Sequence, residues 1–331
     1  MGVMSETLRI GALGAASITP TALLRPAREV EGVEVVAIAA RDQARARKYA
    51  AKHEIPRVHA SYDALLADPD IDAIYVPLPN ALHCEWTLRA LEAGKHVLCE
   101  KPLASNAVEA ERMNEAAERS GRVLAEALHW RYHPLAARVS EILASGEIGA
   151  LRRVESSFCF PLPLPGDIRW RYDLAGGALM DAGCYPVSIV RFLAGAEPEV
   201  MSAKAKLASS RVDRLMQIDL RFPDGVTGFV RASLFSAYVL ALRARAIGDA
   251  GELDVFNPIA PQFFHRLTVR GRDGKRREKL PGDASYIHQL RAFRDWVRGG
   301  VAMCTDGAHG VANMRVIDAA YRAAGLPLRG V

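Results

Sequence analysis

The sequence predicts an α/β protein in which an N-terminal doubly wound parallel sheet precedes an α+β domain with a large, mostly antiparallel open sheet. Three observations support this fold class. Short apolar runs alternate with longer helical patterns from residue 7 to about 127, which is the rhythm of βαβ units. β-rich segments with turn signals then take over. The 331 residues also exceed one ordinary core, so we expect domains over residues 1–127 and 128–331.

Charge and cysteine usage limit the classes of function. The chain has 43 Lys and Arg residues against 38 Asp and Glu, a net charge of +5 that suits an anionic ligand. The basic run RGRDGKRREK at 270–279 lacks aromatic residues, so we interpret it as a charged hairpin or loop tip and expect no nucleic acid. The five cysteines form no CxxC pair, which favours reduced thiols in a cytoplasmic protein over disulfides or a metal site. We expect no signal peptide and no membrane span, because no apolar run approaches the length of one.

Five apolar runs predict the strands of the first domain: LRIGAL (8–13), VEVVAIAA (33–40), DAIYVPL (72–78), HVLCE (96–100) and RVLAEAL (122–128). Helical patterns lie between them at 42–53, 80–94 and 108–121, and the last two end on a glycine suited to a helix C-terminus. This alternation predicts a nucleotide-binding domain.

The second domain begins with an expected connecting helix over about 132–145. Strand-like segments follow at 151–160, 199–208, 215–222, 226–235 and 240–248. PDG at 223–225 and RDG at 272–274 predict turns. Helical patterns at 285–299 and 306–324 end the chain, and we expect them to pack back across the molecule.

The first strand runs into GALGAASITP, an imperfect glycine fingerprint. Read from Gly14, the GxGxxG spacing falls on Gly14, Ala16 and Thr19, so only the first glycine is kept. Gly14 allows a tight turn, Ala16 leaves room for a pyrophosphate, and Thr19 with Pro20 suits an N-cap and first helical residue. The following helix would direct its N-terminal dipole at a phosphate. The alternative is a small-residue turn that only packs a helix closely.

The second strand ends in AIAARD, which bears on the choice of cofactor. An NAD site usually has an acid at this strand end to hold the ribose hydroxyls. Arg41 occupies the position here, with Arg45 one helical turn on, and a guanidinium suits the 2′-phosphate of NADP. A solvated arginine is the alternative reading, and Asp42 next to it is an alternative acid.

The third and fourth strands also end in distinctive residues. Pro77 cannot continue a paired strand, Asn80 is suited to cap the next helix, and His83 is either a helix-surface residue or part of the site. The fourth strand places Glu100 and Lys101 before a proline at the same carboxyl edge, where such folds bind ligands. A surface salt bridge is the alternative for this pair. Glu100 either orients Lys101 or balances its charge.

GGALMDAGCYP at 176–186 forms a second group of candidate residues. Asp181 and Tyr185 stand four apart and share a helix face, and Gly183 removes bulk near a ligand. Pro186 should kink or restart the helix. An ammonium such as Lys101 would lower a tyrosine pKa from about 10 towards neutrality, which gives a proton-transfer set. Helix capping by Asp181 and a core position for Tyr185 are the structural alternatives.

The order of the glycine turn, LPNALH, AGKHVLCEKPLA, GEIGALRRV and GGALMDAGCYP resembles the Gfo/Idh/MocA oxidoreductases over nearly the whole chain. The resemblance implies a Rossmann domain, then an α/β domain whose open sheet often forms dimers, and NAD(P)-linked chemistry on sugars, polyols and related compounds. It implies that Lys101 contacts the nicotinamide ribose and substrate. Tyr185 stands where this family often has histidine, as in the subgroup of glucose-fructose oxidoreductase and dimeric dihydrodiol dehydrogenases. Trp170 and Arg171 match a pair that lies against the cofactor in that subgroup.

The resemblance and the residues together predict an NADP-preferring oxidoreductase. It would transfer hydride between nicotinamide and a CH–OH carbon of a sugar, polyol or trans-dihydrodiol, as a homodimer or homotetramer through the C-terminal sheet. A non-catalytic dinucleotide-binding sensor and a Schiff-base enzyme are the alternatives. The candidate catalytic residues are Lys101, Asp181 and Tyr185, and the candidate cofactor-binding residues are Gly14, Ala16, Ser17, Ile18, Arg41, Pro77, Asn80, His83, Glu100, Lys101, Trp170 and Arg171.

Overall fold

The computed structural model describes residues 7–163, 166–272 and 274–330. The chain divides into two compact units that are built from interleaved segments. The first comprises the described residues up to Ala104 together with Val108–His129 and Tyr286–Val311. The second comprises Ser105–Ala107, Trp130–Ser285 and the described residues from Ala312 onward.

The first unit contains a six-stranded sheet in the order β3-β2-β1-β4-β5-β6, in which every pairing is parallel. Its strands are β1 Leu8–Leu13, β2 Val33–Ala39, β3 Arg57–His59, β4 Ala73–Val76, β5 His96–Cys99 and β6 Leu124–Glu126. This is the doubly wound order, which reverses between β1 and β4 and binds ligands at the carboxyl ends of the strands there. The predicted Rossmann sheet is therefore confirmed.

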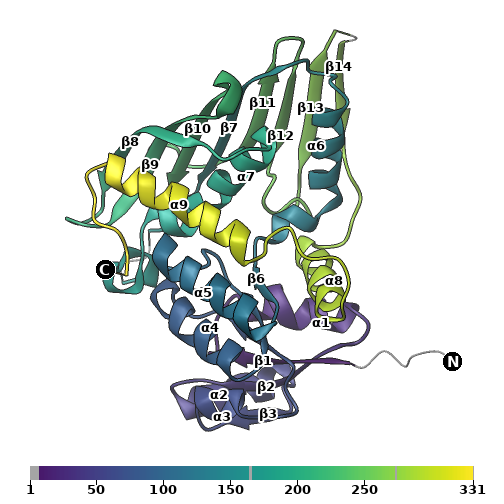
Figure 1. Ribbon diagram of the computed structural model, residues 1–331, viewed down its shortest axis with the longest axis vertical. Coiled ribbons are helices and arrows are strands. Elements are labelled where there is room, and N and C mark those ends of the chain that lie inside the picture. Colours follow the sequence, from purple (N-terminus) through teal and green to yellow (C-terminus); the bar gives the residue numbers. More distant parts are fainter. Residues whose placement is uncertain (1–6, 164–165, 273, 331) are drawn as a thin grey trace, which may run out of the picture. The chain divides into compact units, whose positions relative to one another are not determined.

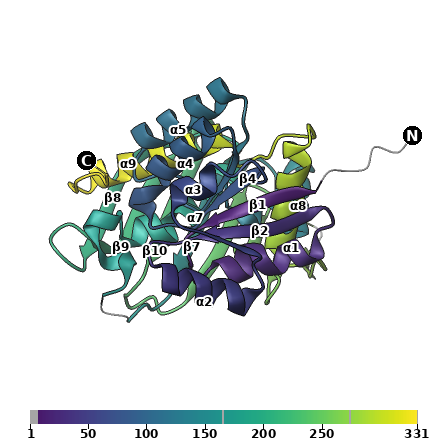
Figure 2. The same cartoon turned by 90° about the horizontal axis from the view of Figure 1, so that it is seen from below.

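Helices cover both faces of this sheet (Figure 2), α4 and α5 on one and α1 and α2 on the other. The helical segments are η1 Pro20–Leu24, α1 Arg25–Glu29, α2 Gln43–His53, α3 Tyr62–Leu66, η2 Asn80–Leu82, α4 His83–Glu92, α5 Ala107–Ser120 and α8 Ser285–Val297, and η3 His129–Tyr132 begins at the last residue before the chain enters the second unit. β3 and α3 were not predicted from the sequence, because each is too short to show a recognisable hydrophobic periodicity.

α8 is tied to the first unit by hydrogen bonds to the turn that precedes β2. The guanidinium of Arg294 donates to the carbonyl of Glu31 at 2.7 Å, and that of Arg298 donates to the carbonyl of Gly32 at 3.0 Å. Further along, the hydroxyl of Thr305 donates to the carbonyl of Glu126 in β6 at 2.7 Å. The segment 286–311 thus completes this unit from far along the chain.

The second unit contains an eight-stranded sheet in the order β14-β13-β12-β11-β7-β10-β9-β8, antiparallel except for the β7–β10 pair. Its strands are β7 Leu151–Cys159, β8 Glu199–Leu207, β9 Asp213–Arg221, β10 Thr227–Ser233, β11 Ala241–Gly248, β12 Glu252–Phe256, β13 Arg266–Gly271 and β14 Gly274–Glu278. The mostly antiparallel open sheet that the sequence predicts is confirmed.

Helices lie on one face of the second sheet, with α7 against β7, β10 and β11 (Figure 1). The helical segments are α6 Pro134–Ala144, η4 Ile168–Trp170, η5 Tyr172–Leu174, η6 Leu179–Gly183, α7 Cys184–Ala194, η7 Pro223–Gly225 and α9 Gly307–Ala323. The sequence did not indicate β12, and it indicated β13 and β14 only through the hairpin or loop tip expected at 270–279. The basic run at 270–279 is a hairpin, as predicted, although Asp273 of the predicted turn lies outside the described residues. No described helix is long and apolar enough to span a membrane.

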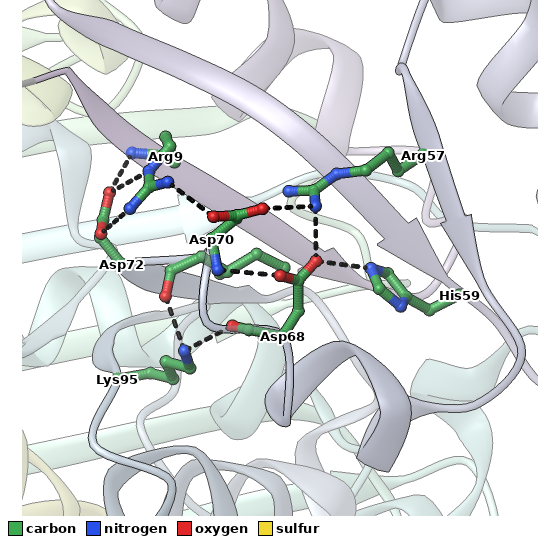
Figure 3. A network of polar contacts seen from close by, with 8 residues as sticks. Arg9, Arg57, His59, Asp68, Asp70, Asp72 and Lys95 are labelled. Carbon is green, nitrogen blue, oxygen red and sulfur yellow. Dashed lines mark hydrogen bonds and ion pairs between the residues drawn. The ribbon is translucent and has the colours of Figure 1, made fainter.

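A polar network lies at the amino-terminal side of the first sheet (Figure 3). The guanidinium of Arg9, in β1, donates two hydrogen bonds to the carboxylate of Asp72, just before β4, with lengths of 3.0 and 3.1 Å. Asp68 is buried, and its Oδ2 lies 2.8 Å from Arg57 and 3.0 Å from His59 of β3. Burial alone would raise the pKa of Asp68, but the backbone N–H of Asp70, the Arg57 guanidinium and the His59 ring together lower it below its usual value.

We expect Asp68→Asn to lower the free energy of unfolding by about 1–3 kcal/mol, because it leaves buried donors without their charged acceptor. Urea unfolding at pH 7 measures this loss. Asp70→Asn is the matched control, since its side chain is 64% exposed and such ion pairs contribute about 0–1 kcal/mol.

The lowered pKa of Asp68 also predicts that the free energy of unfolding depends on pH. Because the folded-state pKa of Asp68 is lowered, its contribution is present above about pH 4 and is lost as the pH falls through the folded-state pKa. The difference in stability between wild type and Asp68→Asn should therefore shrink in acid. A constant difference down to pH 2 would contradict this assignment.

Candidate active site

The turn after β1 requires a glycine. Gly14 has φ +93°, and a Cβ there would lie 3.1 Å from Cδ2 of Leu78. Two side chains of α2 hold the following loop, since Arg45 donates to the carbonyl of Ala15 at 2.8 Å and Tyr49 donates to that of Ala16 at 3.0 Å. The loop continues through Ser17, which is exposed, and Ile18, which is half-buried. This small, backbone-lined turn fits the close approach of a dinucleotide phosphate.

The helix after this turn differs from the expectation. Thr19 stands at the N-cap position, as predicted, but it is fully buried in helical geometry and its side chain makes no capping hydrogen bond. Pro20 does occupy the first helical position, as predicted. The segment Pro20–Leu24 is a π-helix, in which the N–H of Arg25 donates to the carbonyl of Pro20. Pro26 lacks an N–H and so cannot make the α-type bond to Ala22, which favours the wider turn.

The tip of β2 places Arg41 on the surface and gives Asp42 a structural role. Oδ1 of Asp42 accepts the backbone N–H of Arg45 at 3.0 Å and caps α2. This capping bond accounts for the acid that the sequence left as an alternative ribose ligand.

Glu100 and Lys101 lie at the carboxyl end of β5, and the structure explains the acid. Glu100 is 8% exposed, and its carboxylate accepts the hydroxyl of Tyr75 at 2.7 Å and the backbone N–H of Lys101 at 3.3 Å. Burial raises the pKa of Glu100, opposed by the Lys101 ammonium and the Tyr75 hydrogen bond. The carboxylate thus fixes the backbone from which the half-buried Lys101 side chain extends.

His83 lies inside the unit, not on a helix surface. Its side chain is 0% exposed, with Nδ1 2.8 Å from the carbonyl of Pro102 and Nε2 2.8 Å from that of Leu78. Burial lowers its pKa. His83 therefore links the segments that follow β4 and β5, near the buried Pro77. Asn80 does not cap α4, whose N-cap is Leu82, so that prediction is wrong.

Asp181 and Tyr185 begin the helix of the second unit that carries the second motif. The π-helix η6 holds Asp181 and runs into α7, which holds Tyr185. Pro186, the third residue of α7, cannot donate to the carbonyl of Ala182, which explains the wide turn just before it. Such π-turns are frequent at functional sites. Tyr185 is 5% exposed and packs edge-on against Phe158.

Gly183 has a packing role, contrary to the expectation of room for a ligand. A Cβ at this position would lie 2.6 Å from the Leu179 side chain and 3.1 Å from Cβ of Ala232 in β10. Glycine is thus required for the helix to approach the sheet.

Arg169 is a neighbour of Asp181 that the sequence did not indicate. Its Nε lies 2.9 Å from Oδ2 of Asp181, so the acid is held as one half of an ion pair. Arg171, which the resemblance favoured, pairs with the exposed Asp173. Trp170 packs against an apolar cluster that includes Ala178 and Ala182. The described contacts thus gather Arg169, Trp170, Asp181 and Tyr185 in the second unit, and His83, Glu100 and Lys101 in the first.

Comparison with protein families decides the relationship. The model of the oxidoreductase family with an NAD-binding Rossmann fold matches residues 8–128, and the GFO/IDH/MocA C-terminal domain matches residues 136–254. The chain belongs to the Gfo/Idh/MocA family. As a member of it, the protein is an NAD(P)-dependent oxidoreductase, and the resemblance seen in the sequence is confirmed.

Individual relatives of this Gfo/Idh/MocA protein extend over most of its length. D-xylose 1-dehydrogenase (NADP(+)) 2 of Haloferax volcanii is 37% identical over 318 residues, covering 96% of this chain and 97% of that protein. Trans-1,2-dihydrobenzene-1,2-diol dehydrogenase of Sus scrofa is 34% identical over 227 residues, covering 68% and 67%. Among solved structures, a 3-ketoreductase from Actinomadura kijaniata in complex with NADP and TDP-benzene has a TM-score of 0.89 at 30% identity, covering 96% and 98%.

Gly14→Ala should weaken NADPH binding by about tenfold, since a positive φ costs a non-glycine residue about 1–2 kcal/mol and the new methyl displaces Leu78 from the turn. Fluorescence titration of NADPH measures the change. Gly121→Ala is the control, because Gly121 also has positive φ (62°) but a Cβ there meets nothing within 4 Å. Equal affinity losses in the two variants would show that backbone strain alone is responsible.

Proposed function

We propose that the protein is an NADP-preferring oxidoreductase that transfers hydride between nicotinamide and a CH–OH carbon of a sugar, polyol or trans-dihydrodiol. The observation that carries the proposal is the anchored Lys101 at the carboxyl end of β5, one strand beyond the switch point of the sheet. The xylose and dihydrobenzenediol dehydrogenases among the relatives support this substrate range. We assign cofactor binding to residues 1–127, and substrate binding and oligomerisation to residues 128–331.

The bound nicotinamide supplies or accepts the hydride. Tyr185 exchanges a proton with the substrate hydroxyl through its phenolic oxygen. The Lys101 ammonium stabilises the phenolate form and holds the substrate oxygen. Asp181, kept in place by Arg169, orients this pair. The phosphate-binding turn is formed by Gly14, Ala16, Ser17 and Ile18. The cofactor is lined by Pro77, Asn80, Glu100, Trp170 and Arg171. His83 supports cofactor binding indirectly, because its ring holds the backbone carbonyls of Leu78 and Pro102.

The Actinomadura kijaniata 3-ketoreductase supports the choice of catalytic side chains. That protein has been crystallised with a tyrosine replaced by phenylalanine, and with a lysine replaced by alanine or by glutamate. The same two residue types, tyrosine and lysine, carry the proton transfer proposed here. A non-catalytic sensor is not favoured, because the named relatives are dehydrogenases and reductases.

Two further assignments belong to this proposal. The second sheet has a hollow lined by Arg153, Phe229, Arg231 and Arg243, and the Phe229 ring beside the ion pairs of Arg153 with Glu155 and of Arg243 with Asp254 suits a homodimer or homotetramer contact. The five free cysteine thiols support a cytoplasmic location.

Tyr185→Phe should lower kcat by about 10²–10⁴-fold, because it removes the proton-transferring oxygen while keeping the ring. A panel of sugars, polyols and dihydrodiols followed at the nicotinamide absorbance identifies the substrate, and the variant is then measured with it. The affinity for NADPH should stay unchanged. Tyr238→Phe is the control, because Tyr238 lies on a loop and is 41% exposed. Near wild-type turnover in Tyr185→Phe would refute the mechanism.

Arg41→Ala should raise KM for NADPH by about tenfold and leave KM for NADH unchanged, because only NADPH presents a 2′-phosphate to the guanidinium. Arg47→Ala serves as the control for a general loss of positive charge, because Arg47 is also exposed and lies close by in the sequence, in α2. Equal effects on both cofactors would place the 2′-phosphate site elsewhere.

A further inference from the structure

A fully buried ion pair lies in the second unit, away from the residues assigned to chemistry. Asp213 begins β9 and Arg329 lies near the chain end, and both side chains are 0% exposed. Nη2 of Arg329 donates to Oδ1 of Asp213 at 3.0 Å, and the hydroxyl of Tyr321 in α9 donates to the same oxygen at 2.9 Å. Burial raises the pKa of Asp213, and the charge of Arg329 opposes this shift.

This pair holds both sides of the turn that leads into η6. Oδ2 of Asp213 accepts the backbone N–H of Leu179 at 2.7 Å, and Nε of Arg329 donates to the carbonyl of Gly176 at 2.8 Å. Gly177, between them, has φ +139°, and a Cβ there would lie 2.2 Å from Oδ1 of Asp213. The turn is thus fitted around the two charges, with no space for a side chain.

The turn is directly connected to the segment that carries Asp181 and leads to Tyr185. The N–H of Asp181 donates to the carbonyl of Gly177 at 3.0 Å. Gly176 donates to the carbonyl of Arg171 at 2.8 Å, and a Cβ on it would lie 2.5 Å from the carbonyl of Arg169, the partner of Asp181. A shift of the turn would therefore move Asp181, its ion-pair partner and the first turn of the helix that carries Tyr185.

We propose that Asp213 and Arg329 are positioning residues, which act through the Gly176–Leu179 turn to set the positions of Asp181 and Tyr185. The inference rests on the proposed function, because it assigns a task to the pair only if those two residues carry proton transfer. A remote displacement of about 1 Å can cost on the order of 10²-fold in rate, so a rigid support for the turn has a catalytic consequence.

The energetics favour positioning over stability as the role of the pair. Removing two charges from water costs several kcal/mol per ion, and apolar residues of the same volume are often as stabilising. A buried pair, however, has directional bonds that apolar side chains lack. Arg329 is itself fixed, since its carbonyl accepts Nδ2 of Asn106 at 2.8 Å and the carbonyl of Leu328 accepts the Tyr172 hydroxyl at 2.5 Å.

The test compares variants of the full-length chain by two readouts. Arg329→Met removes the charge, and Arg329→Lys retains it without the planar guanidinium that reaches both Asp213 and the carbonyl of Gly176. Asp213→Asn keeps the volume but places an amide N–H against one of the donors. Leu267→Ala, fully buried in β13, is the control for a loss of stability in the same unit without a contact to the turn. Amide hydrogen exchange of peptides covering 176–185 and of β11–β13 is measured beside kcat, KM and NADPH affinity.

We expect exchange at 176–185 to quicken by at least about tenfold in Arg329→Met and Asp213→Asn, with little change in β11–β13. Their kcat should fall by about tenfold or more at unchanged NADPH affinity, and Arg329→Lys should lie between them and wild type. Leu267→Ala should lower the melting temperature and leave kcat unchanged. The inference is overturned if the charge variants quicken exchange uniformly across the unit, or if they keep wild-type kcat.

These outcomes separate the inference from the proposed function. If Tyr185→Phe keeps its turnover, the proton-transfer mechanism fails, and faster exchange confined to 176–185 in Arg329→Met then supports anchoring of the turn alone. If Tyr185→Phe is inactive but Arg329→Met behaves as Leu267→Ala does, the mechanism stands and the positioning role is refuted. Should Arg329→Met not fold, Arg329→Lys and Asp213→Asn give the same comparison.

Discussion

The structure depends on one constraint, which is that a charged or polar side chain inside a protein must have a partner. In the described part of this chain several of these partners are backbone groups of the functional motifs. Glu100 accepts the N–H of Lys101, and His83 spans two carbonyls after β4 and β5. In the second unit Asp213 and Arg329 take up an N–H and a carbonyl of the glycine turn. The buried polar groups thus set the backbone of each motif, from which the reactive side chains extend.

Proline determines the shape of the two helices that begin at these motifs. Pro26 follows the π-helix that begins at Pro20 after the glycine turn, and Pro186 follows the π-helix that carries Asp181. In each case a missing N–H removes an α-type bond and a wider turn takes its place. The first residues of both helices are therefore held by their surroundings instead of by regular helical bonds.

The fold could be predicted where buried elements appear in the sequence as apolar runs or periodic hydrophobic patterns. The inner strands of the first sheet are apolar runs, and two of the three helical patterns between them end on a glycine, so the alternation of strands and helices could be predicted from the pattern alone. β3 is too short to show a period, and β14 is built almost entirely of exposed polar residues. Lys101, Asp181 and Tyr185 could be proposed from the sequence because each lies in a contiguous motif. The contact between Arg329 and Asp213 could not be predicted, because the two residues are 116 positions apart and local sequence patterns do not indicate such a distant contact.

The interleaving of the two units has a consequence for how this protein can be divided. The described chain passes between the units after Ala104, Ala107, His129, Ser285 and Val311. A fragment that ended at residue 127 would lack α8 and Thr305, and with them the hydrogen bonds to the turn before β2 and to β6. The dinucleotide-binding part is therefore not a cassette that can be cut out and grafted onto another protein. Swapping modules to change substrate range would require exchanging discontinuous segments together.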